Sequence, residues 1–223
     1  MGIRDSFDPH NAFDPPPEYL RRYLNNLDHI PLPNYVEGEL ENKPIFQLMD
    51  HDATTPKPYG IEYDQLSDTE HRLIRAAYWA MCDLIDDQVG ELLDLLETTN
   101  QLEDTLVIFM SDHGEMLGDH GIYLKGPYFY DPAIRVPFIL SYPGYIQENK
   151  TSGEMVELSD IAPTILEAAG IEIPPWIQAK SLWTLLNGTG VTHREDIYCE
   201  YYNAKPWHTN PTAQLTSVRT CLL

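Results

Sequence analysis

Acid, imidazole and amine groups gather in one short stretch of the sequence, just past an apolar run. Asp112 and His113 lie directly beyond the run Leu106–Met110, and Lys125 comes thirteen positions after Asp112. Five consecutive branched, apolar and aromatic residues have the length and content of a buried strand. The carboxyl ends of such strands are where open α/β sheets bind their ligands. The segment after residue 110 is therefore the best candidate for a reactive site.

Asp112 and His113 have the chemistry of metal ligands. A carboxylate beside a neutral imidazole can bind Ca²⁺, Mn²⁺ or Zn²⁺, although all-oxygen sites are more usual for Ca²⁺. The alternative is a turn in which the Asp112 carboxylate caps the backbone that follows it. Short motifs of this kind have low specificity, so the two residues alone leave both interpretations open.

Lys125 is a candidate contact for an anionic substrate. The loop before it contains Gly114, Gly118 and Gly121, which allow the backbone to fold back toward the Asp112-His113 pair. An ammonium group there could bind a substrate oxygen as a point charge. The alternative is a solvated surface lysine, which is the commoner state of an arbitrary lysine.

His10 and the pair Asp119-His120 are the other polar groups of interest. His10 follows Pro9 and precedes Pro15, and the two prolines stiffen the chain around the imidazole. An ordered imidazole in a loop could act as a general acid or bind an anion, although an isolated histidine is more often non-catalytic. Asp119 and His120 are expected to hydrogen-bond the loop rather than to bind a metal.

The charge balance excludes some classes of partner. Lys and Arg number 14 against 35 Asp and Glu, which gives a formal net charge of −21. A phosphate backbone needs clustered basic residues, so no nucleic-acid partner is expected. An anionic substrate would be repelled unless a metal or a local lysine reversed the sign. No apolar run has transmembrane length and no signal peptide is recognisable, so we expect no membrane partner and, by default, a cytoplasmic location.

Hydrophobic periodicity predicts one long helix after a proline-rich start. Residues 6–58 are rich in Pro and Asp and indicate an ordered loop with one short helix near Glu18–Asn26. Ser67 and Glu70 form a capping box, and apolar residues spaced by threes and fours follow it. This pattern predicts an amphipathic helix of roughly 30 residues.

Further strands are predicted to follow the reactive segment. Arg135–Ser141 and Asp196–Tyr202 are the second and third strand candidates, and Ser159-Asp160 are expected to cap a short helix that ends before Gly170. Three strands are few for an α/β chain of 223 residues, because a typical sheet has five or six. We therefore expect a partial domain.

These segments together resemble sulfatases of the alkaline phosphatase superfamily. Residues 111–121 and 125–137 are similar to the second metal-binding segment of that family, and Asp8–Leu20 resembles its substrate-histidine loop. Ala77–Leu93 is similar to its long central helix, and Leu158–Leu166 to the helix that follows. The resemblance runs from about Ser6 to about Thr220, which is almost the whole chain.

The resemblance implies an α/β fold, a partial alkaline phosphatase-like mixed sheet with flanking helices. Residues 1–223 would form a single partial sulfatase catalytic domain. Within it, residues 1–66 would be the substrate-histidine loop region, 67–98 the long helix, and 105–223 the metal-site strand with the α/β elements after it.

The resemblance also implies roles for four residues. Asp112 and His113 would be ligands of one divalent cation, and His10 and Lys125 would hold sulfate oxygens or the ester oxygen. Many sulfatases have Asn at the position of His113, whereas one subgroup of sulfatases and the related phosphonate and phosphate ester hydrolases have His. Ca²⁺ is the first expectation, and the histidine leaves Mn²⁺ or Zn²⁺ open. The implied activity is hydrolysis of a sulfuric ester in a sulfated small molecule or glycan. The alternatives are a phosphonate monoester or phosphodiester hydrolase, or a catalytically inactive truncated protein.

The sequence departs from the family pattern at the nucleophile. Sulfatases use a formylglycine made from Cys or Ser within Cys/Ser-x-Pro/Ala-x-Arg, and none of Cys82, Cys199 and Cys221 stands in that motif. The family's Asp-Asp metal ligands precede it, whereas Asp86-Asp87 lies inside a predicted helix and is expected on its solvated face. We therefore expect a chain truncated at both ends, whose activity in isolation is open.

Overall fold

The computed structural model describes residues 4–54, 60–190, 192–202, 205, 207–208 and 213–220. The chain divides into two compact units. The first unit comprises residues 1–99, 113–135 and 203–213, and the second comprises 100–112, 136–202 and 214–223. The reactive segment crosses from the second unit to the first between Asp112 and His113.

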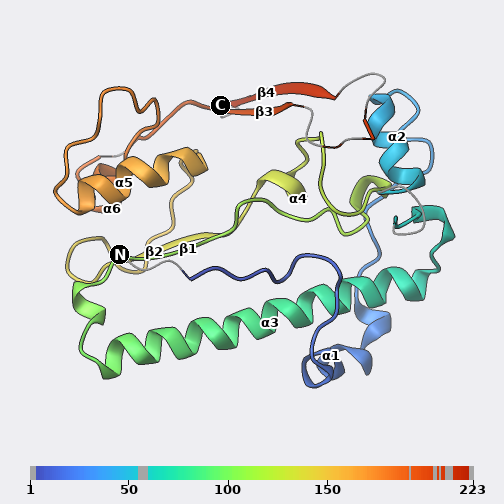
Figure 1. Ribbon diagram of the computed structural model, residues 1–223, viewed down its shortest axis with the longest axis horizontal. Helices are drawn as coiled ribbons and strands as arrows, with labels where there is room; N and C mark the ends of the chain where they lie inside the picture. Colours follow the sequence, from blue (N-terminus) through green and yellow to red (C-terminus); the bar gives the residue numbers. More distant parts are fainter. Residues whose placement is uncertain are drawn as a thin grey trace. The chain divides into compact units, whose positions relative to one another are not determined.

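The first unit is mainly helical. Its long helix α3 lies beside the short helix α1, as Figure 1 shows. Single turns of 3-10 helix connect the longer elements. The helices are α1 (Pro17–Leu24), α2 (Ile45–Asp52), α3 (Asp68–Thr98) and α4 (Asp131–Ile134), and the 3-10 turns are η1 (Leu27–His29), η2 (Tyr63–Gln65) and η4 (Asp119–Gly121).

Helix α3 begins at the predicted capping box. The Ser67 hydroxyl accepts the Glu70 backbone N–H at 3.3 Å, and the Glu70 carboxylate accepts the Ser67 backbone N–H at 2.8 Å. Small residues on the buried face, including Ala76 and Ala80, allow close packing along the first half of the helix. In the described part of the chain no helix is both long and apolar enough to cross a membrane.

Removal of this cap offers a test of the helix start. We expect Ser67→Ala to lower the free energy of unfolding by about 1 kcal/mol, because the Glu70 backbone N–H loses the hydroxyl oxygen that accepts it. Thr69→Ala is the matched control, since it removes a hydroxyl from the same exposed turn without touching the cap. Urea unfolding followed by circular dichroism measures both changes. Equal effects of the two substitutions would contradict the assigned role of the box.

The contact between α1 and α3 involves the predicted helical acid pair. Tyr19 donates its hydroxyl hydrogen to Asp87 at 2.7 Å, and the Arg22 guanidinium binds Asp83 at 3.0 Å. The Asp87 side chain is 49% exposed, as predicted for a solvated face. Its partners Tyr19 and Arg22 show that this face also holds α1 in place.

The prediction of only one short helix between residues 6 and 58 is wrong. Helix α2 begins after Pro44, and it buries Phe46, Gln47, Asp50 and His51. Three of these four side chains are polar, so the apolar periodicity that marks a helix is missing from the sequence. Tertiary partners of the polar groups stabilise α2 instead.

The predicted site loop forms the core of the first unit. Met116, Ile122 and Tyr128 are buried, and they pack in one cluster with Leu40 of the N-terminal region and Ala133 of α4. Since the loop supplies three of these five residues, core packing holds its backbone in place.

The second unit contains two antiparallel strand pairs. Strand β1 pairs with β2 from Val107↔Ser141 to Met110↔Phe138, and β3 pairs with β4 from Asp196↔Thr220 to Tyr202↔Gln214 (Figure 1). The elements are η3 (Leu102–Asp104), β1 (Val107–Met110), β2 (Phe138–Ser141), η5 (Leu158–Asp160), α5 (Ile161–Ala168), α6 (Trp183–Leu186), β3 (Asp196–Tyr202) and β4 (Gln214–Thr220).

The three predicted strands are confirmed, with one later start. Strand β2 begins at Phe138 rather than at Arg135. Pro137 has no N–H to donate to a strand ladder, so regular pairing begins only after it. The short helix expected before Gly170 is also present as α5, and Gly170 has the left-handed φ of +69° that suits a helix end.

The predicted capping role of Ser159-Asp160 is wrong. Neither side chain caps α5; the Asp160 carboxylate instead accepts the backbone N–H groups of Glu157 at 3.0 Å and Lys180 at 2.9 Å. It also binds Arg194, and His193 lies 3.0 Å from it. Burial alone would raise the pKa of Asp160, but these hydrogen bonds and charges lower it below its ordinary value. Asp160 is thus the buried centre of the second unit's polar network.

Candidate active site

His10 is held in a tight turn in the first unit. Its backbone N–H donates to the Phe7 carbonyl at 3.0 Å, and its ring lies 4.6 Å from the Phe7 ring. The ring atom Nδ1 lies 2.6 Å from the Asn11 carbonyl oxygen. Because a carbonyl only accepts, Nδ1 carries the hydrogen and Nε2 is the nitrogen that can meet a substrate. These contacts hold the His10 imidazole in one orientation, as the sequence analysis expected for this loop.

His113 has the same arrangement. Its Nδ1 donates to the Gly114 carbonyl at 2.9 Å, so Nε2 is the nitrogen suited to bind a cation. The backbone that follows is fixed, since the Gly114 N–H donates to the Ala133 carbonyl at 2.8 Å. A Cβ at Gly114 would collide with the Pro132 carbonyl, so only glycine allows this approach to α4.

Asp112 is an exposed residue of the second unit, two positions past the end of β1. The Ser111 hydroxyl donates to its Oδ1 at 3.4 Å. Among the residues that the structure describes, no three His, Cys, Asp or Glu side chains gather as a metal site. Asp112 and His113 alone would leave most of the coordination shell of a divalent cation to other groups. These residues therefore do not form a complete metal site.

Lys125 is half-buried between two anchored backbone positions. Leu124 before it has a left-handed φ of +65°, and its carbonyl accepts the Met116 N–H at 3.0 Å. Gly126 after it accepts the Tyr128 N–H at 2.8 Å. The tight backbone restricts where the ammonium group can reach, which is unlike an ordinary surface lysine.

Glu115 is a member of the site that the sequence analysis did not distinguish. Its carboxylate accepts the Leu117 N–H at 3.2 Å. Burial raises the pKa of Glu115, while backbone hydrogen bonds and the positive charges of Lys125 and His113 act in the opposite direction. Glu115 is therefore close enough to feel both candidate groups. Its position inside the Asp-His-Gly-Glu run was the available signal.

Asp119 and His120 hold the loop, as predicted. The Asp119 carboxylate accepts the Asn34 N–H at 2.9 Å and binds Arg75. His120 Nδ1 lies 2.9 Å from Glu39, and its ring stacks on Tyr130 at a centroid distance of 3.9 Å. Their polar atoms are therefore engaged in tying the loop to the N-terminal region and α3.

The structure places His10, His113 and Lys125 in the first unit and Asp112 in the second. Glu115 links His113 and Lys125 electrostatically. The contact of His10 and Lys125 with one substrate, and the sharing of one cation by Asp112 and His113, stay predictions.

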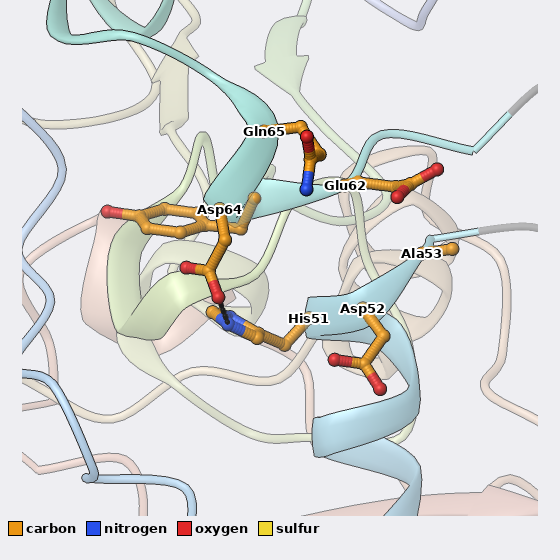
Figure 2. Close-up of a pocket in the computed structure, with 7 residues that line it drawn as sticks. His51, Asp52, Ala53, Glu62, Asp64 and Gln65 are labelled. Atoms are coloured by element: carbon orange, nitrogen blue, oxygen red, sulfur yellow. Dashed lines mark ion pairs between the residues drawn. The ribbon is translucent and has the colours of Figure 1, made fainter.

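A separate pocket of about 320 Å³ lies at the end of α2 in the first unit. Figure 2 shows His51 and Asp64 pointing toward each other, and their ion pair measures 3.3 Å. Three carboxylates line this pocket, so it would repel an anionic ester. It also contains none of the predicted site residues; its lining is His51, Asp52, Ala53, Glu62, Tyr63, Asp64 and Gln65.

Comparisons with known proteins agree on one family. The sulfatase family profile matches residues 9–171. An arylsulfatase of Clostridium perfringens is 34% identical over 197 residues, which are 86% of this chain and 38% of that protein. An N-acetylglucosamine-6-O-sulfatase of Bacteroides thetaiotaomicron is 36% identical over 135 residues, 59% of this chain and 24% of that protein.

A solved structure gives the same fold. The phosphonate monoester hydrolase of Silicibacter pomeroyi superposes with a TM-score of 0.82 at 26% identity, covering 95% of this chain and 44% of that one. The predicted α/β, alkaline phosphatase-like fold class is thereby confirmed. The chain spans less than half the length of each of these three proteins.

Proposed function

Because the chain belongs to the sulfatase family, we propose that it serves in the hydrolysis of a sulfate ester. The observation that carries this proposal is the anchored Lys125 within the family segment, with the Nδ1 atoms of His10 and His113 both engaged by backbone carbonyls. This tautomer places the lone pair of each ring on its Nε2 atom. We propose a sulfated small molecule or glycan as the substrate class, since a relative acts as an N-acetylglucosamine-6-O-sulfatase.

Lys125 and His10, both in the first unit, would bind the negatively charged oxygens of the ester. The Lys125 ammonium would bind a sulfate oxygen and stabilise negative charge that develops on it. His10 Nε2, when protonated, would donate a hydrogen bond to a sulfate oxygen or to the ester oxygen. A net charge of −21 repels anions, so these local donors are what makes an anionic substrate acceptable.

We propose Asp112 and His113 as two ligands of a divalent cation, Ca²⁺ first and Mn²⁺ or Zn²⁺ as alternatives. Such a cation would supply positive charge opposite the sulfate group. The described residues do not complete its shell, so no step is assigned to it. The formylglycine motif of the family does not occur in this sequence, so no nucleophilic role is assigned to any residue here.

A phosphonate monoester hydrolase is the second candidate. It is favoured by His113 at the position after Asp112 and by the superposition on such a hydrolase. A phosphonate monoester, like a sulfate ester, presents anionic oxygens to a lysine and an imidazole. The fold alone therefore does not separate the two reactions.

The two candidate functions can be distinguished by comparing the turnover of an aryl sulfate with that of the matching aryl phosphonate. We expect the native protein containing this chain to hydrolyse an aryl sulfate with a kcat/KM at least tenfold above that for the matching aryl phosphonate. The same leaving group in both substrates keeps its departure constant. A reversed ratio would establish the second candidate. Failure to hydrolyse either ester, with Ca²⁺, Mn²⁺ and Zn²⁺ each supplied, would support the catalytically inactive alternative.

A further inference from the structure

A buried charged cluster lies in the first unit outside the predicted site. Asp50, near the end of α2, has a fully buried carboxylate. Its Oδ2 accepts a hydrogen bond from Lys205 Nζ at 2.8 Å, and its Oδ1 lies 3.0 Å from His208 Nε2. The partners are 155 and 158 positions away from Asp50 along the chain. The cluster therefore joins distant segments at one point.

That point is Gly126, the residue after Lys125. A Cβ at Gly126 would lie 2.9 Å from Lys205 Nζ and 3.0 Å from Asp50 Oδ2, which is closer than side-chain atoms tolerate. Lys205 Nζ also lies 5.9 Å from the centre of the Tyr128 ring, two residues further on. The Asp50–Lys205 ion pair thus packs against Gly126, the residue that directly follows Lys125.

Stability alone does not explain the cluster. A buried ion pair loses most of its Coulomb gain to desolvation, so apolar residues would stabilise such a position at least as well. Within the described residues, Trp207 Nε1 and His208 Nδ1 are also buried without a hydrogen-bond partner. Buried polar atoms of that kind cost free energy. A charged pair in this place is better explained by the geometry that it imposes.

We propose that Asp50 and Lys205 are positioning residues that fix the Lys125–Gly126 turn and thereby the direction of the Lys125 ammonium group. The inference rests on the proposed anion-binding role of Lys125. His208 holds the second oxygen of Asp50, so the carboxylate presents one fixed edge to Lys205 and Gly126. A displacement of about 1 Å in a catalytic group can cost on the order of a hundredfold in rate.

A double-mutant cycle on the native protein containing this chain tests the proposal. We expect Asp50→Asn to lower kcat/KM for an aryl sulfate, and the affinity for inorganic sulfate, by about tenfold to a hundredfold. In the Lys125→Ala background the same change should have less than a twofold effect, because the group being positioned is gone. A purely structural role would reduce both backgrounds equally, and that result would overturn the proposal.

Glycine substitutions give a second cycle in case Asp50→Asn does not fold. Gly126→Ala displaces the ion pair directly, whereas Gly90→Ala is a control whose Cβ meets nothing within 4 Å. We expect only Gly126→Ala to weaken sulfate binding, again through Lys125. If the protein binds sulfate but hydrolyses no ester, the proposed function fails. The positioning role is then still tested by comparing the sulfate affinities of the variants with and without Lys125→Ala. A protein that binds no sulfate would overturn the positioning role as well.

Discussion

Replacing Lys125 with alanine in the native protein is expected to lower kcat/KM for an aryl sulfate by about 10²–10³-fold, the effect of losing one donor that stabilises developing oxyanion charge. The structure supports a large effect because Leu124, at φ +65°, and the crowded Gly126 restrict the lysine between them. Steady-state kinetics on an aryl sulfate and titration with inorganic sulfate measure the change.

Lys150→Ala is the matched control, because Lys150 is an exposed lysine of the second unit. Its removal changes the net charge by the same amount as the removal of Lys125. Lys125→Arg should recover only part of the activity, since a planar guanidinium does not reproduce a compact ammonium charge. Equal kinetics for the Lys125→Ala and Lys150→Ala variants would show that Lys125 is an ordinary surface residue.

Local patterns predicted the elements that local interactions stabilise. Helix α3 carries its own start signal, and the Ser67–Glu70 capping box forms as expected. Strand β1 is one apolar run, and it lies within one residue of its predicted start. Helix α2 was missed because Asp50 and His51 occupy its buried face, which hides the apolar period.

In the candidate site too, residues close in sequence were predicted, whereas residues brought together by the tertiary fold were not. Asp112, His113 and Lys125 share one short segment, so residue type and spacing were sufficient to select them. Asp50 could not be selected, because its partner Lys205 is brought to it only by the tertiary fold. Glu115 was in view, but nothing in the sequence indicated that the fold would raise the pKa of its carboxyl group through burial.

Asp160 was singled out from the sequence but was assigned the wrong role. Its position before α5 indicated a helix cap, but its carboxylate oxygens accept from groups that lie up to 34 residues further along the chain. A carboxylate with four neighbouring donors can be stable while fully buried, because each oxygen is satisfied.

Asp160→Asn is expected to destabilise the second unit by about 3 kcal/mol, since the neutral amide removes one partner of a buried ion pair. Arg194, which is only 10% exposed, would then keep a single ion-pair partner, Glu157 at 3.0 Å. Asp196→Asn is the matched control, because Asp196 is an exposed carboxylate of the same unit, and a change of about 0–0.5 kcal/mol is expected. Urea unfolding at neutral pH measures both substitutions. A cost for Asp160→Asn as small as that of the control would contradict a central role.

The pH dependence of the same variant gives an independent sign test. The pKa of Asp160 is lower in the folded protein than its ordinary value, so ionised Asp160 stabilises the fold above that ordinary value, about 4. The stabilisation is lost as the pH falls through the folded pKa, because the unfolded chain then binds the proton first. The amide that replaces the carboxyl group in the variant cannot titrate, so the stability gap between wild type and the Asp160→Asn variant should narrow as the solution is acidified below about pH 4. A gap that stayed constant from neutral to acid pH would mean that packing, rather than the charge of Asp160, holds this network together.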